Sequence, residues 1–234
     1  MRYVRDITGR FHQRPHYEMR ELDEECDDII TSFMLEHHGR MLLPISTDDL
    51  TKLIERDADD LDLYSDLSGE GPDVEGVTYF RPGQKPIVRI ASGLSENRLR
   101  TTLPHEYGHV KFHVSLWQRV EKPTLDLFAE ATSMSVQKCQ RAKIVQAAAS
   151  DWMEWQAGYI CGAILMPIRP LRKLVQMYLE RYNLYAPLSM SKQAARELIT
   201  QVSSQFAVSQ DAARVRLIKM GYITEQEVGL SLFG

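Results

Sequence analysis

The chain has 234 residues, of which 44% are hydrophobic and 26% are charged, and it carries a formal net charge of −4. These are ordinary values for a globular protein that can bury a sizeable core. Its three cysteines are widely spaced and form no C-x-x-C pair, which argues against both a disulfide scaffold and a cysteine zinc knot.

The sequence also contains no segment that predicts membrane targeting. Its first 20 residues are polar and are interrupted by Gly9 and Pro15, so they predict no secretory signal peptide. The longest apolar run, Tyr159 to Ile168, is too short to cross a bilayer. Because the cysteines also suit a reducing compartment, we expect a cytoplasmic protein without a membrane partner.

The predicted elements divide the sequence into four regions. They are a flexible tail at residues 1–13, a helical region with an acidic loop at 14–75, a core at 76–167, and a second helical region at 168–234. We expect an α+β protein that is mainly helical, in which a small β-sheet or hairpin packs on one helix of the core.

Two helices and a loop are predicted before the core. Apolar residues recur at helical spacing over residues 15–38. Ser46, with Asp49 three positions later, resembles a capping box that begins a second helix. Residues 57–76 are rich in Asp, Ser, Gly and Pro, so we expect a surface loop there with little regular structure.

The core begins with a predicted β-hairpin. Val77–Phe80 and Ile87–Ile90 are runs of β-favouring residues. Residues 81–86 separate them and contain the proline and glycine residues that are typical of turns.

The hairpin is followed by a five-residue motif, His105-Glu106-Tyr107-Gly108-His109, which reads H-E-x-x-H. On a helix the two histidines lie one turn apart on the same face, so both imidazoles can reach one metal ion with the Glu106 carboxylate beside it. This arrangement is typical of zinc-dependent hydrolases and predicts His105 and His109 as metal ligands and Glu106 as the general base. A surface helix with two satisfied histidines is the alternative.

The motif helix has one unfavourable residue. Ser95 is a suitable N-cap, and Glu96 suits the positive end of the helix dipole. Pro104, however, removes a backbone N–H and clashes with the preceding turn. We therefore expect either a kink at Pro104 or a helix that begins there. Since a sheet edge in zinc peptidases often pairs with an extended substrate, we also expect Ile87–Ile90 to lie at such an edge.

A catalytic zinc site needs a third protein ligand and an open position for water. Phe112 and Ser115 stand where the metzincin pattern requires glycine and histidine, which excludes that class. His113 lies four residues beyond His109, which is about 6 Å along a helix and too far to share the metal. We expect His113 to pack beside the site or to bind substrate.

Carboxylates are the remaining candidates for the third ligand. Glu154 is the best of them because it opens an apolar helix that can pack closely on the motif helix, and a buried carboxylate needs a partner. Asp151 is better suited to cap that helix. The other two candidates are Asp126 and Glu130.

These motifs together resemble the ImmA/IrrE family of metallo-endopeptidases. Besides H-E-x-x-H, the resemblance rests on Glu154-Trp155-Gln156-Ala157 through Leu165-Met166-Pro167 and on the segment from Phe206 to Leu217. It is strong over about 97–167 and moderate over 187–222. The sequence departs from the family pattern at Pro104, Gln156 and Gly158.

The resemblance implies a zincin-like core in which His105, His109 and Glu154 hold zinc and Glu106 is catalytic. Members of the family cleave helix-turn-helix repressors of the XRE type and thereby release genes of mobile elements or stress responses. We therefore expect a zinc-dependent endopeptidase with such a repressor as its protein substrate and with Mn²⁺ as the alternative metal.

The sequence leaves two questions open. One is which residue donates a hydrogen bond to the oxyanion that forms during peptide hydrolysis, and the other is the class of function. His113, Tyr159 and Tyr79 are unranked candidates for that donor or for substrate contacts. Gln205–Leu217 is similar to the second half of a helix-turn-helix, so the chain is alternatively a metal-sensing regulator whose C-terminal region binds DNA. A third interpretation is a catalytically silent zinc protein that serves as a partner module, against which the intact Glu106 argues.

Overall fold

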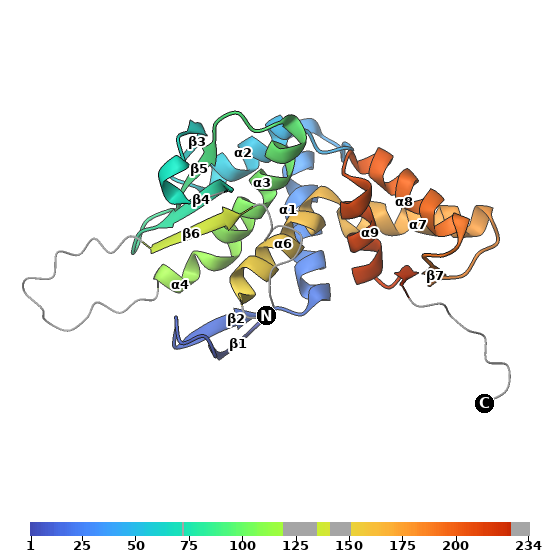
Figure 1. Ribbon diagram of the computed structural model, residues 1–234, viewed down its shortest axis with the longest axis horizontal. Helices are drawn as coiled ribbons and strands as arrows, with labels where there is room; N and C mark the ends of the chain where they lie inside the picture. The colour runs from blue at the N-terminus through green and yellow to red at the C-terminus, as the bar shows by residue number, and fades with distance from the viewer. Residues whose placement is uncertain (72, 119–134, 141–150, 226–234) are drawn as a thin grey trace, which may run out of the picture. The chain divides into compact units, whose positions relative to one another are not determined.

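The computed structural model describes residues 1–71, 73–118, 135–140 and 151–225, with only the backbone described over 135–140. Helices predominate and the strands form small sheets, so the predicted α+β class is confirmed in general terms (Figure 1). The chain forms two compact units. One comprises Met1–Ile29 with Ser46–Ile164, and the other comprises Ile30–Ile45 with Leu165–Gly234.

The first unit contains a four-stranded sheet in the order β3-β5-β4-β6 (Figure 1). Strand β5 is parallel to β3 and antiparallel to β4, and β6 is antiparallel to β4. The predicted hairpin is therefore confirmed as β4 and β5. The bounds of the strands are Asp60–Ser65 for β3, Val74–Phe80 for β4, Ile87–Ala91 for β5 and Ser135–Gln140 for β6.

Two sequence predictions about this sheet are wrong. Ile87–Ile90 does not lie at an edge, because β5 is hydrogen-bonded to β3 on one side and to β4 on the other. Residues 57–76 are not an irregular loop, because they contain β3, a 3₁₀ turn at Ser68–Glu70 and the start of β4. The alternation of leucine with polar residues in β3 is the period-two signal of a strand, which the high aspartate content outweighed in the prediction.

The helices of the first unit follow the predicted order. Ser46 caps α2, since its hydroxyl oxygen accepts from the Asp49 backbone N–H at 3.0 Å, so the predicted serine cap at the start of this helix is confirmed. Helix α3 starts directly after Ser95 and runs through Pro104 without ending there. A π-helical turn, His109–His113, follows it. The remaining bounds are Met19–His38 for α1, which contributes to both units, Thr47–Asp57 for α2, Glu96–Gly108 for α3, Ser115–Gln118 for α4 and Trp152–Leu165 for α6.

The N-terminal residues form a hairpin where the sequence predicted a flexible tail. Strands β1 (Arg2–Arg5) and β2 (Gln13–His16) pair antiparallel. The buried Asp6 carboxylate organises the connecting loop by accepting from the backbone N–H of Thr8 at 3.0 Å and of Phe11 at 3.1 Å. Burial opposes the charge of Asp6, but these hydrogen bonds lower its pKa below the usual range.

The second unit is built on α7 (Ile168–Arg181), α8 (Gln193–Phe206) and α9 (Gln210–Lys219). Short parallel strands, β7 (Leu188–Ser189) and β8 (Ile223–Thr224), complete it. Helix α8 ends at a left-handed residue and α9 begins at a serine cap, which produces the tight turn between them. The side chains that form the core of this unit include Leu171, Val175, Leu198, Val202, Phe206 and Leu217.

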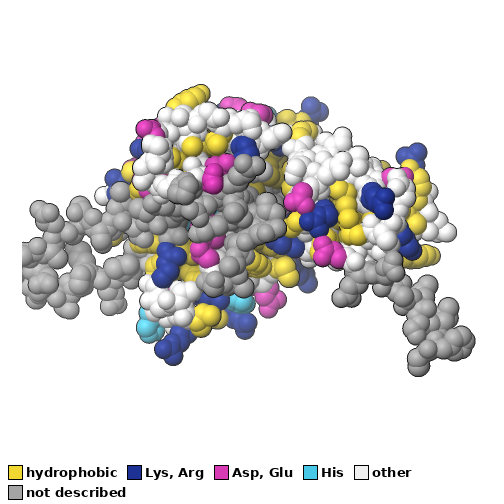
Figure 2. Space-filling view, in the orientation of Figure 1, with side chains coloured by type: hydrophobic (Ala, Val, Ile, Leu, Met, Phe, Trp, Pro, Cys, Tyr) yellow, Lys and Arg dark blue, Asp and Glu magenta, His cyan; other side chains and the backbone are white. Residues whose placement is uncertain are grey.

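Acidic and basic side chains are interspersed over the face that Figure 2 shows, in keeping with the modest net charge. Among the helices that the structure describes, none has both the length and the apolar character of a membrane span.

Candidate metal centre

Two helices of the first unit, α3 and α6, approach each other closely enough to combine their side chains in one site. A Cβ atom on Gly108 would lie 3.1 Å from the Cα of Ala157, so the helix backbones meet where α3 has no side chain. Three residues before these positions lie His105 on α3 and Glu154 on α6, roughly one turn away. The small residues therefore set the distance between the predicted ligands.

The structure brings His105, His109 and Glu154 together. Each offers one ligand atom, and these atoms lie within 4.8 Å of one another. Nε2 of His105 lies 3.2 Å from Oε2 of Glu154, and Nε2 of His109 lies 3.3 Å from Oε1. All three side chains are at most 1% exposed. Among the described residues, this group could hold a metal ion.

The chemistry of the donor set fits a metal better than a plain ion pair. Nε2 of His109 is buried and has no hydrogen-bond partner among the described residues, although Oε1 of Glu154 is only 3.3 Å away. The two atoms are near each other but not aligned for a hydrogen bond. Two nitrogens and a carboxylate oxygen that converge in this way are a common protein ligand set for zinc.

The Glu154 carboxylate keeps its charge in this buried position. Burial by itself would raise the pKa of Glu154, but the adjacent imidazoles of His109 and His105 more than offset it and hold the pKa well below its usual range. At neutral pH the carboxylate is ionised, as a metal ligand must be.

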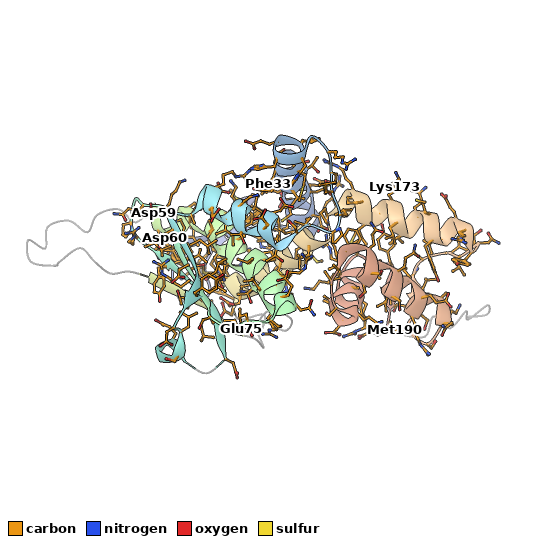
Figure 3. The ribbon with its side chains drawn as sticks, turned by 90° about the horizontal axis from the view of Figure 1, so that it is seen from above. Phe33, Asp59, Asp60, Glu75, Lys173 and Met190 are labelled. Carbon is orange, nitrogen blue, oxygen red and sulfur yellow. The ribbon has the colours of Figure 1, made fainter. Side chains whose placement is uncertain are left out.

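Glu106 points from α3 towards strand β4. The hydroxyl of Thr78 donates to Oε2 of Glu106 at 2.5 Å, and both residues are fully buried. A Cβ atom on Gly76 would lie 2.5 Å from Oε1, so only glycine at that position leaves room for the carboxylate. Glu75, labelled in Figure 3, forms an ion pair with Arg98 and so links the same part of β4 to α3.

His113 lies behind His109 rather than among the ligand atoms. Its Nδ1 is 3.0 Å from Nδ1 of His109, and its Nε2 is 3.0 Å from Oε1 of Gln156. The side chain is fully buried. Burial, with the neighbouring His109, lowers the pKa of His113 to about 3, so the ring is neutral at physiological pH.

The other candidate residues are engaged elsewhere. The hydroxyl of Tyr159 donates to Oδ2 of Asp23 at 3.0 Å. Tyr79 lies next to Thr78 in β4, so it faces the opposite side of the sheet, where its hydroxyl donates to Glu70 at 3.1 Å. Asp151 precedes α6 and accepts from the Glu154 backbone N–H at 3.5 Å, a long cap bond. Asp126 and Glu130 lie outside the described residues.

Sequence reasoning missed three residues of this site: Gly76, Thr78 and Gln156. An isolated glycine within a β-favouring run signals a close approach of another group, so Gly76 carried a usable signal. Thr78 and Gln156 carried none, because an ordinary strand threonine and an ordinary helix glutamine have the same local patterns.

No protein-family profile matches the chain, and no curated protein matches its sequence. The chemistry of the site therefore rests on its geometry. A buried group of two imidazoles and one carboxylate could hold a metal, and a second buried carboxylate follows the first imidazole on the same helix.

Proposed function

We propose that the chain is a zinc-dependent endopeptidase with a zincin-like core. The observation that carries this proposal is the convergence of His105, His109 and Glu154 in a buried group, with Glu106 next to His105 on the same helix. A structural zinc site has four protein ligands and no need of a buried base, whereas a catalytic site has three and leaves one position open.

In this proposal His105, His109 and Glu154 hold the ion. A bound zinc ion would supply a Lewis acid that acidifies water and polarises the scissile carbonyl. Glu106 accepts the proton of the attacking water and passes it to the leaving amine. The Thr78 hydroxyl holds one oxygen of that carboxylate, which fixes its orientation on the side of β4.

The substrate is proposed from the resemblance of the motifs to the ImmA/IrrE family. It is a cytoplasmic helix-turn-helix repressor of the XRE type, whose cleavage relieves repression. A ligand set of two imidazoles and one carboxylate favours zinc over Mn²⁺, because Mn²⁺ prefers oxygen ligands.

Purified protein incubated with an XRE-type repressor tests the proposal, with and without a chelator and with zinc added back. The expected result is cleavage that the chelator abolishes and zinc restores. A repressor that stays intact while a generic peptide library is cut would remove the substrate but keep the enzyme class. No hydrolysis of either substrate by the zinc-loaded protein would favour the silent partner module.

Fewer observations support the alternative that the chain is a DNA-binding regulator. On α9, Arg214 pairs with Asp211 and Glu225, each at 2.8 Å. Arg216 is 3% exposed and donates to the backbone carbonyl of Met166. Two basic side chains of the helix are thus engaged within the protein rather than presented to phosphates. A salt-dependent gel shift with duplex DNA would be needed to revive this alternative.

A further inference from the structure

We propose that His113 and Gln156 are positioning residues that fix the tautomer of His109 and anchor it to the N-terminal hairpin. The inference rests on the metal-binding part of the proposed function, because it concerns the nitrogen that His109 offers to the ion. It adds two residues to the site and gives the hairpin a part in it.

A continuous chain of hydrogen bonds carries the inference. Nδ1 of His109 lies 3.0 Å from Nδ1 of His113, and Nε2 of His113 lies 3.0 Å from Oε1 of Gln156. Nε2 of Gln156 donates to the backbone carbonyl of Pro15 at 3.3 Å. Pro15 belongs to β2, so the chain runs from the hairpin to the metal ligand.

The Pro15 carbonyl fixes the direction of every hydrogen bond between it and His109. The Pro15 carbonyl can only accept, so the amide nitrogen of Gln156 must face it and the amide oxygen must face His113. That oxygen in turn requires a proton on Nε2 of His113, which leaves Nδ1 of the neutral ring as an acceptor. His109 must then carry a proton on Nδ1, which leaves Nε2 as the nitrogen that faces Glu154 and would take the ion.

His113 lies on the π-helical turn His109–His113, which follows α3 directly. The rings of His109 and His113 are tilted by 55°, with their centroids 5.1 Å apart and their Nδ1 atoms within hydrogen-bonding distance. Turns of this kind are rare in proteins and occur often at functional sites.

The N-terminal hairpin covers the end of this hydrogen-bond series that lies farthest from His109. The His113 ring packs edge-on against Trp152, with centroids 5.5 Å apart, and the Arg14 guanidinium lies 5.1 Å from the centre of the Trp152 ring. Both His113 and Gln156 are at most 1% exposed, so water does not compete for their bonds. His105 differs, since its Nδ1 has no hydrogen-bond partner in the part of the chain that the structure describes. The proposed device therefore acts on one imidazole of the pair.

The tautomer of His109 can be read in the metal-free wild-type protein by long-range ¹H–¹⁵N correlation spectroscopy. The expected result is a proton on Nδ1 of His109, with or without a second proton on Nε2. A His109 ring without a proton on Nδ1 would overturn the proposal. This measurement needs neither a variant nor a substrate, so it decides the matter even if the protein cuts no peptide.

Variants add a second readout, which is zinc affinity measured by competition with a chelator. Gln156→Leu removes the acceptor of His113, and we expect a mixture of His109 tautomers and a loss of zinc affinity of about 10- to 100-fold. Gln176→Leu, the same change at an exposed position of α7, is the control and should bind zinc as the wild type does.

His113→Phe provides a second route if Gln156→Leu does not fold. The phenyl ring preserves the packing on Trp152 but offers no nitrogen to His109. We again expect mixed tautomers and a similar loss of zinc affinity. Unchanged tautomer and unchanged affinity in either folded variant would overturn the proposal. Failure of all proteins to cleave substrate, with these shifts present, would instead count only against the peptidase assignment.

Discussion

The backbone of Ala157 lies so close to Gly108 that a Cβ atom on the glycine would be 3.1 Å from the alanine Cα. Gly108 belongs to the H-E-x-x-H motif, and Ala157 lies three residues after Glu154. The contact therefore joins the helix that carries the two histidines to the helix that carries the carboxylate. The separation of the two histidines from the carboxylate therefore depends on the absence of a side chain at Gly108.

Replacing Gly108 with valine should separate α3 from α6. The valine side chain would meet the backbone of Ala157, which cannot move aside as a flexible side chain can. We expect a loss of stability of about 1–3 kcal/mol, typical of overpacking, together with weaker zinc binding. Urea denaturation and chelator competition measure the two effects. Gly69→Val is the control, because a Cβ atom there meets nothing within 4 Å.

The three residues of the buried group could be predicted from the sequence because their signals are local or strongly constrained. His105 and His109 need only the helical period to lie on one face. Glu154 is apart in sequence, but a carboxylate at the start of an apolar helix is costly to bury without a partner, and that physical conflict identified it. The serine cap at Ser46 was predictable for the same reason, since it is complete within four residues.

The features that could not be predicted from the sequence depend on contacts between distant segments. Gln156 acquires its role only because Pro15, far away in the chain, lies beside it. Thr78 acquires its role because β4 passes next to α3. The expectation for Ile87–Ile90 was wrong because strand order depends on pairing between distant segments. Its partner β3 lies in an aspartate-rich region that the sequence predicted to be a loop.

Gly76→Ala should impair turnover without releasing the metal. The new methyl group would occupy the space of the Glu106 carboxylate, since its position is 2.5 Å from Oε1 and 2.9 Å from Cδ. Glu106 must then shift, and a displacement of about 1 Å can cost roughly 100-fold in rate. The measurement is the rate of peptide cleavage beside the zinc content after dialysis. Full activity in Gly76→Ala would show that the present position of Glu106 is not the productive one.

Thr78 offers a sharper test of the same contact because two substitutions differ by one hydroxyl group. Thr78→Val keeps the shape but removes the donor to Glu106, and we expect about 10- to 100-fold slower cleavage. Thr78→Ser keeps the donor and should remain close to wild-type activity. Equal rates for the two variants would contradict an orienting role of this hydroxyl.

The two buried glutamates should respond differently to the same conservative change. Glu106→Gln removes the base, so cleavage should slow by about 10²- to 10⁴-fold while zinc stays bound. Glu154→Gln replaces an anionic ligand with a neutral amide, so zinc should be lost on dialysis and activity with it. Elemental analysis and a cleavage assay on both variants separate the roles. Zinc retained at wild-type affinity by Glu154→Gln would argue against Glu154 as a ligand.

Zinc should stabilise the folded protein because the three ligands converge only in the native state. A metal that binds only the native state adds about 2.7 kcal/mol when its free concentration is 100 times its dissociation constant. In a protein of this size each kcal/mol raises the melting temperature by about 2–4 °C, so zinc should raise it by roughly 5–11 °C. Magnesium, which prefers oxygen ligands, is the matched control and should leave the melting temperature unchanged. Glu154→Ala should lose most of the zinc-dependent shift because its two histidines no longer share the ion with a carboxylate. An equal shift in that variant and the wild type would place the stabilising zinc at other residues.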